Sequence, residues 1–225
     1  MCGRLILFNP INPMDILARF QVSADNLVPR YNMAPSQDIP VIINDGRNHL
    51  VMYRWGLIPY WAEDISIGNT LINARGETVD EKPSFRYSLP RRRCLVVADG
   101  FYEWRREGRR KYPYRITLKN NELFGLAGLW DTWKSPDGEM IHSCTIITTT
   151  ANELIQPLHD RMPVILSKEA EPIWLDPHVT DSRLLKSLLT PYPADQMSLY
   201  EVTSRVNSPK FDDPECLVAA LPRLF

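Results

Sequence analysis

Cysteine is scarce in this chain, and its four copies form no C-x-x-C pair: Cys2, Cys94, Cys144 and Cys216. A disulfide framework depends on many cysteines in a secreted chain, and a zinc site depends on clustered thiolate and imidazole ligands. Only four histidines are present, and just one of them, His142, lies close to a cysteine. The sequence therefore predicts no disulfide, no metal site and no cofactor.

Long hydrophobic runs and a large net charge are also missing. Runs such as Cys94–Ala98 and Phe124–Trp130 have the length of strands, whereas a membrane-spanning helix needs about 20 residues. The N-terminal stretch has no small-residue cleavage site before Pro10, so no signal peptide is predicted and the expected compartment is the cytoplasm. Because 44% of the 225 residues are hydrophobic and the net charge is −1, we expect a folded chain.

Positive charge is concentrated in one stretch. Between Arg86 and Arg115, ten Lys or Arg residues stand against three acidic ones, so this segment carries +7 and the rest of the chain −8. A solvated hairpin tip is one interpretation of such a cluster. An anionic partner is the other, and a phosphodiester backbone is the commonest such partner.

Strand patterns dominate the middle of the chain, and helical patterns lie mostly toward its ends. The turn signal Asp45-Gly46 between two apolar runs predicts a β-hairpin. Strands are predicted at Ile39–Ile43, Leu50–Trp55, Cys94–Trp104, Tyr112–Leu118, Leu123–Trp130, Glu139–Thr149, Val164–Leu166 and Leu199–Val206, and short helices at Pro13–Phe20, Ser84–Arg92, Asn152–Pro157, Lys168–Leu175 and Ser182–Leu189. The expected fold class is α+β: a single domain over residues 1–225 with a central antiparallel, barrel-like β-sheet flanked by short helices.

Polar residues stand out in three short segments, and each has a plain structural alternative. Glu103 lies between two aromatic residues, where partial desolvation would raise its pKa toward that of a useful general acid or base. The alternative is the outward residue of an amphipathic strand. His159 is either a group that transfers protons or a histidine held by a structural hydrogen bond. Asn73 and Arg75 either belong to a functional site or share one solvated face of a strand. Trp61 suits the core or a platform on which bases stack.

Cys2 adds a reactive possibility. An initiator Met is normally removed when the second residue is as small as Cys, and this removal leaves a free amine and a thiol on adjacent carbons. An α-amino group has a pKa of about 7.7–8.0, so an appreciable fraction is neutral and nucleophilic. An aldehyde would form an imine with this amine, and the thiol would close a thiazolidine ring. The ring-opened sugar of an abasic site is the aldehyde that suits a basic, aromatic surface.

Five ordered motifs resemble those of the SRAP (SOS-response-associated peptidase) family, whose members process abasic sites. They are MCGR at residues 1–4, YNMAP at 31–35, NARGET at 73–78, DGFYEW at 99–104 and HDRMP at 159–163, and VNSP at 206–209 looks like a closing motif. The resemblance covers essentially the whole chain. It implies that the protein shields abasic sites in single-stranded DNA through a covalent thiazolidine, made by Cys2 after Met1 is removed.

The resemblance also implies a role for each matched residue. Cys2 would be the nucleophile, Asn73 would hold its amine and the opened sugar, Glu103 would shuttle protons, and His159 would assist opening of the sugar. Three arginines would grip phosphates, namely Arg4, Arg75 and Arg161. Bases beside the lesion would be wedged or stacked by Asn32, Pro35 and Trp61. Single-stranded DNA with abasic sites is the expected partner, and a monomer that associates with the nucleoid through DNA is the expected form.

Two other functions fit some of the same residues. Cys2, His159 and an acid would suit a cysteine peptidase, although a thiol protease does not require its Cys at the second position, and limited self-cleavage that frees Cys2 fits better than general proteolysis. A binding module that uses only the basic stretch and the aromatics would bind intact and abasic strands alike. A denaturant-resistant complex formed only on abasic DNA separates these functions.

Overall fold

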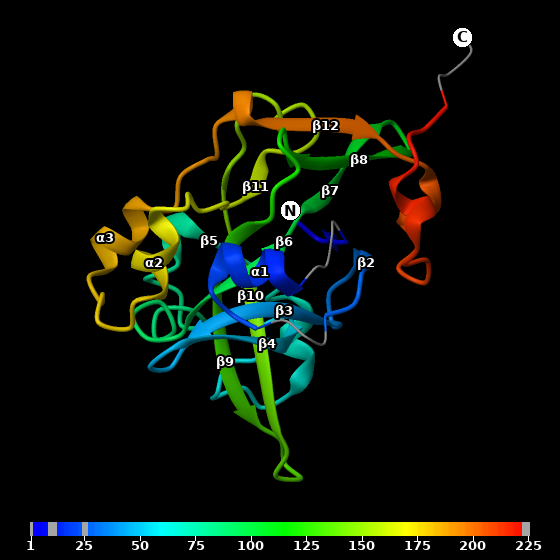
Figure 1. Ribbon diagram of the computed structural model, residues 1–225. Coiled ribbons are helices and arrows are strands. Elements are labelled where there is room, and N and C mark those ends of the chain that lie inside the picture. The colour runs from blue at the N-terminus through cyan, green and yellow to red at the C-terminus, as the bar shows by residue number, and fades with distance from the viewer. Residues whose placement is uncertain (1, 9–12, 24–26, 222–225) are drawn as a thin grey trace.

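A closed ring of five strands forms the centre of the molecule. The computed structural model describes residues 2–8, 13–23 and 27–221. The ring contains β3 (Asp38–Asn44), β4 (Asn48–Trp55), β6 (Arg93–Ala98), β9 (Phe124–Lys134) and β10 (Met140–Thr150). It runs β10-β4-β3-β6-β9 and closes where β9 pairs with β10 (Figure 1). Apolar side chains from all five strands fill its interior, which confirms the barrel-like α+β fold.

The sheet is not wholly antiparallel as expected, because β10 makes two parallel pairings. Its first half pairs with β4, and its second half pairs with β5 (Asn73–Arg75). Farther along, β10 pairs antiparallel with β11 (Arg161–Pro163). Thr148 lies opposite Arg75 on one side and Pro163 on the other. Two of the predicted polar segments therefore flank the same end of one strand.

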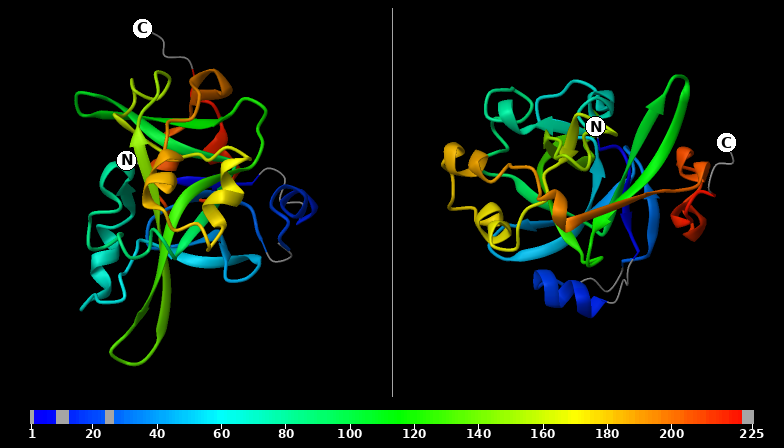
Figure 2. Two further views of the ribbon diagram at one scale, coloured as in Figure 1. Left: turned by 90° about the vertical axis from the view of Figure 1, so that its left-hand side faces the viewer. Right: turned by 90° about the horizontal axis from the view of Figure 1, so that it is seen from above.

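A second sheet places the N-terminal segment beside the acidic DGFYEW segment. Its order is β12-β8-β7-β1-β2, all antiparallel. The strands are β1 (Leu5–Leu7), β2 (Arg30–Met33), β7 (Gly100–Glu107), β8 (Arg110–Leu118) and β12 (Met197–Glu201). Leu5 lies opposite Phe101, so this register brings Gly3 toward Glu103. The β7–β8 hairpin extends away from the barrel (Figure 2).

Helices are short and lie at the periphery. They are α1 (Pro13–Phe20), α2 (Ala170–Leu175) and α3 (Ser182–Ser187), with 3-10 turns at Ile65–Asn69, Gly76–Thr78, Ala194–Gln196, Ser204–Asn207 and Pro214–Leu217. Figure 1 shows α2 and α3 together on one side of the barrel. Within the described ranges, no helix has the length and apolarity needed to cross a bilayer.

The predicted strand Cys94–Trp104 is wrong as a single element. Asp99 divides it into β6 and β7, which belong to different sheets. Its carboxylate accepts the Phe8 N–H at 2.6 Å, and its own N–H donates to Ile6 O at 3.0 Å. These bonds to a segment more than ninety residues away hold the chain where it changes sheets.

Other differences are local. The predicted helices Ser84–Arg92 and Asn152–Pro157 are successions of turns. The strand expected at Val164–Leu166 lies earlier, at β11, and Ile165 makes only an isolated bridge. The strand expected at Leu199–Val206 ends at Glu201 and is followed by a 3-10 turn. The hairpin at Asp45-Gly46 is confirmed, with Gly46 at a φ of +124° and its N–H donating to Asn44.

Candidate functional site

Cys2 adjoins Gly3, which lines a cleft, and the Cys2 backbone is held by Asn73. The Cys2 side chain is fully buried, and its carbonyl oxygen accepts a hydrogen bond from Asn73 Nδ2 at 2.8 Å. The parallel pairing of β5 with β10 positions Asn73, and the pairing of β1 with β7 brings the N-terminal segment to Glu103. Two predicted residues from distant parts of the sequence, Asn73 and Glu103, thus lie beside Cys2.

The cleft beside them has a volume of about 540 Å³. Three of the predicted residues line it: Arg4, Glu103 from β7, and His159 from the loop before β11. The other lining residues are Gly3, Trp104, Arg106, Lys111 and Asn207. Except for Glu103, every ionisable side chain of this lining is basic, so the cleft suits an anionic ligand.

Burial controls the ionisation of Cys2 and Glu103. The Glu103 side chain is almost inaccessible, at 3% exposure, and this burial raises the pKa of its carboxyl above the usual range. Burial also raises the pKa of the Cys2 thiol far above its usual range, and the negative charge of Glu103 adds to the effect. At neutral pH the thiol is therefore protonated.

His159 has two alternative hydrogen-bonding states. Its Nδ1 accepts the Arg161 N–H at 3.0 Å and also lies 2.8 Å from Asp160 Oδ1. In the neutral ring Nδ1 accepts the hydrogen bond from the Arg161 N–H. In the imidazolium Nδ1 is protonated and donates a hydrogen bond to Asp160 instead. Burial lowers the pKa of the imidazole, and Asp160 partly opposes this effect. The neutral form therefore predominates at neutral pH.

Two of the three arginines expected to grip phosphates are already bound within the protein. The Arg161 guanidinium makes two hydrogen bonds to Glu77, at 2.5 and 2.9 Å, and a third to Thr148 O at 2.7 Å. Arg4 donates to Asn32 Oδ1 at 2.7 Å and to the Val206 carbonyl at 2.6 Å.

Arg75 and Asn32 occupy opposite environments. Arg75 is exposed at the end of β5, where it is open to an external phosphate. Asn32 is fully buried, so it does not line a DNA channel as expected. Its side-chain amide holds the C-terminal segment by donating to the carbonyls of Val206, Ser208 and Phe211. Asn32 is buried because its side-chain amide provides the hydrogen-bond donors that these three carbonyls need.

Trp61 lies outside the cleft, on the loop between Gly56 and Gly68, which hydrogen bonds attach to the barrel. Its side chain is 44% exposed beside exposed Tyr60, and the half-buried Pro35 is likewise absent from the cleft lining. Tyr60 N–H donates to Asp131 at 3.0 Å, and Trp133 Nε1 donates to Ala62 O at 2.6 Å. The loop is rigidly attached to the barrel.

Glycine is required at the base of this loop. Gly56 and Gly68 approach so closely that a Cβ on Gly56 would lie 2.4 Å from Gly68 O, and Gly56 has a φ of +125°. This contact brings the two ends of the loop together, which fixes the aromatic pair in one place.

Sequence reasoning missed four lining residues: Trp104, Arg106, Lys111 and Asn207. Side chains two apart along a strand share a face, and this alternation would have grouped Trp104 with Arg106. Asn207 belongs to the VNSP segment, and its Oδ1 accepts the Trp104 indole N–H at 2.7 Å. The position of Lys111 follows only from the cross-strand register, where it lies opposite Arg106.

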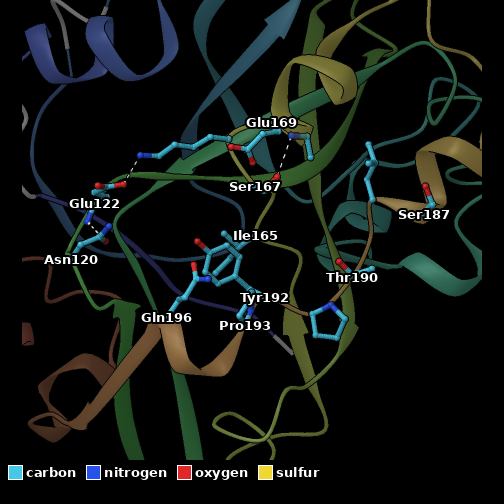
Figure 3. Close-up of a pocket in the computed structure, with 14 residues that line it drawn as sticks. Asn120, Glu122, Ile165, Ser167, Glu169, Ser187, Thr190, Tyr192, Pro193 and Gln196 are labelled. Atoms are coloured by element: carbon cyan, nitrogen blue, oxygen red, sulfur yellow. Dashed lines mark hydrogen bonds and ion pairs between the residues drawn. The ribbon is translucent and has the colours of Figure 1, made fainter.

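A second hollow of about 560 Å³ lies next to α2 (Figure 3). Its lining includes Ser167, Tyr192 and Gln196, and an ion pair joins Lys168 to Glu122 at 2.7 Å. It contains none of the residues that the sequence singled out. Across the described residues, His, Cys, Asp and Glu side chains form no cluster of three that would hold a metal ion.

Comparison with known proteins identifies the family. The family model described as SOS response associated peptidase (SRAP) matches residues 1–209. The chain belongs to the SRAP family. Among relatives, the abasic site processing protein YoqW of Bacillus subtilis (strain 168) is 51% identical over 223 residues, which cover 96% of this chain and 99% of YoqW. The abasic site processing protein HMCES of Xenopus tropicalis is 31% identical and covers 88% of this chain and 68% of its own length.

The SRAP fold is also found among solved structures. The crystal structure of a protein from Bacteroides thetaiotaomicron superposes with a TM-score of 0.88 at 31% identity, and it covers 98% of this chain and 100% of that one. A protein from Bordetella bronchiseptica superposes with a TM-score of 0.78 at 26% identity. These two proteins therefore share the fold of this chain.

Proposed function

We propose that this chain processes abasic sites in single-stranded DNA by forming a thiazolidine between Cys2 and the sugar aldehyde. The observation that carries the proposal is the meeting of Cys2 with Asn73 and Glu103 beside a basic cleft that also contains His159. Relatives named abasic site processing proteins, at 31–51% identity, support the same substrate class.

The reaction begins when the peptide bond between Met1 and Cys2 is hydrolysed. The neutral amine of Cys2 then attacks the aldehyde carbon, a C–N bond forms, and one proton moves from the nitrogen to the carbonyl oxygen, which becomes a hydroxyl. Glu103 removes the second proton from the nitrogen and returns a proton to the hydroxyl, which leaves as water and produces an imine. A carboxyl whose pKa is raised by burial suits both directions of proton transfer.

Ring closure follows without any change of oxidation state. The Cys2 sulfur attacks the imine carbon, an S–C bond forms, and the thiol proton moves to the nitrogen. Capture of the aldehyde releases one water, and the earlier hydrolysis of the Met1–Cys2 bond consumes one. Because the amine reacts first, the sequence of steps tolerates a protonated thiol, which is the form that burial favours.

Asn73 and His159 assist this reaction in different ways. Asn73, bonded to the Cys2 carbonyl, would keep the amine in position for attack. The imidazolium of His159 would donate its Nε2 proton to the ring oxygen as the closed sugar opens. Asp160, at 2.8 Å from Nδ1, would stabilise the protonated ring before the transfer.

The remaining residues divide into DNA contacts and supports. Arg75 would contact a phosphate, and Trp61 with Pro35 would stack against bases beside the lesion. Arg4 and Asn32 would act by holding the C-terminal segment that forms one wall of the cleft.

A general cysteine peptidase fits the same site less well. A thiol nucleophile is activated by a lowered pKa, or by a base within hydrogen-bond reach. Burial and Glu103 instead raise the pKa of the Cys2 thiol. These shifts favour attack by the amine.

The test compares oligonucleotides that differ only in one abasic site. We expect a denaturant-resistant complex with the single-stranded abasic oligonucleotide and none with the intact one. Insertion of Ala between Met1 and Cys2 moves the amine away from the thiol, and it should abolish the complex. A resistant complex on intact DNA, or one that survives the insertion, would contradict the proposal.

A further inference from the structure

Two basic side chains face each other across the β7–β8 hairpin. Arg106 lies directly opposite Lys111 in the antiparallel register, and both line the cleft. Both are exposed, and among the described residues neither side chain makes a hydrogen bond or an ion pair. Like charges placed directly opposite one another destabilise a strand pair. The pairing therefore has an energetic cost that a bound anion would relieve.

The acidic residue nearest in sequence serves the other face of the hairpin. Glu107 pairs with Arg105 at 3.0 Å, and Arg105 also lies over the rings of Tyr112 and Tyr114. Because side chains alternate along a strand, Arg106 lies on the same face of β7 as Trp104 instead. Within the described lining of the cleft, Glu103 is the one carboxylate that the hairpin supplies.

The other arginine of the cleft is already engaged. Arg4 uses its guanidinium for Asn32 and for the backbone of the C-terminal segment. Arg106 and Lys111 are therefore the cleft's cations with free donors. A guanidinium offers a planar fork to a phosphate, and an ammonium adds a point charge.

Arg106 also acts on the reacting groups. Burial raises the pKa of Glu103 and lowers that of His159, and the positive charge of Arg106 opposes the first effect and adds to the second. All three side chains line the same cleft, so an anion bound by Arg106 would lie close to both groups. An abasic nucleotide has no base to be read, so its own phosphates are the charged groups closest to the sugar.

We propose that Arg106 and Lys111 form a binding site for one phosphodiester adjacent to the abasic sugar. The inference rests on the proposed function, because it assumes that the abasic sugar occupies the cleft. The site would draw the lesion toward Glu103 and His159. It would contribute affinity and orientation, while Cys2 supplies the covalent bond.

The test uses a matched pair of double variants. The first is Arg106→Gln with Lys111→Gln, and the control is Arg109→Gln with Arg110→Gln, which removes the same charge from the tip of the same hairpin. Dissociation constants are measured against a single strand that carries a tetrahydrofuran analogue, which has no aldehyde and cannot crosslink. The salt dependence of binding is recorded for each protein.

Loss of one phosphate contact should reduce the slope of log K against log salt by about 0.7 for a single strand, which corresponds to about fivefold weaker binding at 0.1 M salt. The control variant should keep the wild-type slope. Replacing the contacted phosphate by an uncharged methylphosphonate should weaken wild-type binding by a similar factor and leave the Arg106/Lys111 variant unaffected. Equal slopes for both double variants, or a methylphosphonate effect that survives in the first, would overturn the site.

Crosslinking separates this inference from the function on which it rests. With an aldehyde-bearing strand, the Arg106/Lys111 variant should need about fivefold more DNA than the wild-type protein to form the same amount of denaturant-resistant complex. Failure of the wild-type protein to crosslink would refute the proposed function. Normal crosslinking together with unchanged salt slopes would refute the phosphate site alone.

Discussion

Replacing Glu103 by Gln tests whether the buried carboxyl transfers protons during aldehyde capture. The amide keeps the size of the side chain but does not exchange protons at neutral pH. Positioned acid–base groups contribute about 10²–10⁴-fold, so Glu103→Gln should slow capture by that factor, or about 3–5 kcal/mol in activation free energy. The loss should persist when the aldehyde is supplied in a pre-opened form, because the carboxyl acts after the sugar has opened.

The pH dependence gives a second readout of the same change. Loss of water needs the protonated carboxyl, so the capture rate of the wild-type protein should fall as pH rises through the raised pKa of Glu103. Glu103→Gln should lack this falling limb. The Cys2 amine has the opposite effect on the capture rate, because the neutral fraction of the amine increases as pH rises through about 8.

Stability provides the control for misfolding. The folded-state pKa of Glu103 is raised, so the folded protein binds a proton more tightly than the unfolded chain does, and stability falls as pH rises through the folded pKa. Removing the carboxyl should therefore not lower the free energy of unfolding at pH 8. The matched variant Glu107→Gln changes an exposed carboxylate on the same strand and should capture aldehyde at the wild-type rate. Equal slowing by both variants, or no slowing by Glu103→Gln, would refute the proton-transfer role.

Three further changes test other parts of the site. His159→Ala should slow capture of closed-ring abasic DNA, and a pre-opened aldehyde should largely restore the rate; an unrestored rate in stopped-time assays would contradict a role in ring opening. Arg161→Ala should destabilise the fold by about 1–3 kcal/mol in denaturant unfolding, less than a fully buried pair because the Glu77 side chain is 48% exposed. Arg75→Ala should leave unfolding unchanged but reduce the salt slope of DNA binding by about 0.7, and the reverse pattern for these two arginines would mean that their roles are exchanged.

Local signals in the sequence predicted most of the elements but not how the barrel closes. The hairpin at Gly46 and the strands around it follow from turn chemistry and apolar alternation. The parallel pairing of Asn73 with β10 joins segments more than seventy residues apart, and no local pattern reports such a pairing. Asp99 lay within one predicted strand, because its bond to Phe8 N–H, which separates the two sheets, depends on tertiary contact.

The site was predictable where a residue type defines the chemistry. Cys2 was identified by its position, and Glu103 was expected to be desolvated by its aromatic neighbours, in agreement with its burial. Arg161 was less predictable, because the sequence does not show that the Glu77 carboxylate satisfies its guanidinium. Arg106 and Lys111 belong to the basic stretch, whose charge alone did not distinguish a solvated hairpin tip from a site for an anionic partner. The strand register and the lining of the cleft show that both residues face the cleft.

The central claim is that the amine and the thiol of Cys2 both bond to the abasic sugar. The most direct measurement is the lifetime of the complex with single-stranded abasic DNA under denaturing conditions without reductant, for the wild-type protein and for Cys2→Ala. Cys2→Ala retains an N-terminal amine, so it should form an imine that borohydride traps but that hydrolyses when untreated. The wild-type complex should persist untreated and resist reduction, because the ring has no C=N bond. An untreated Cys2→Ala complex as long-lived as the wild-type complex would contradict thiazolidine formation.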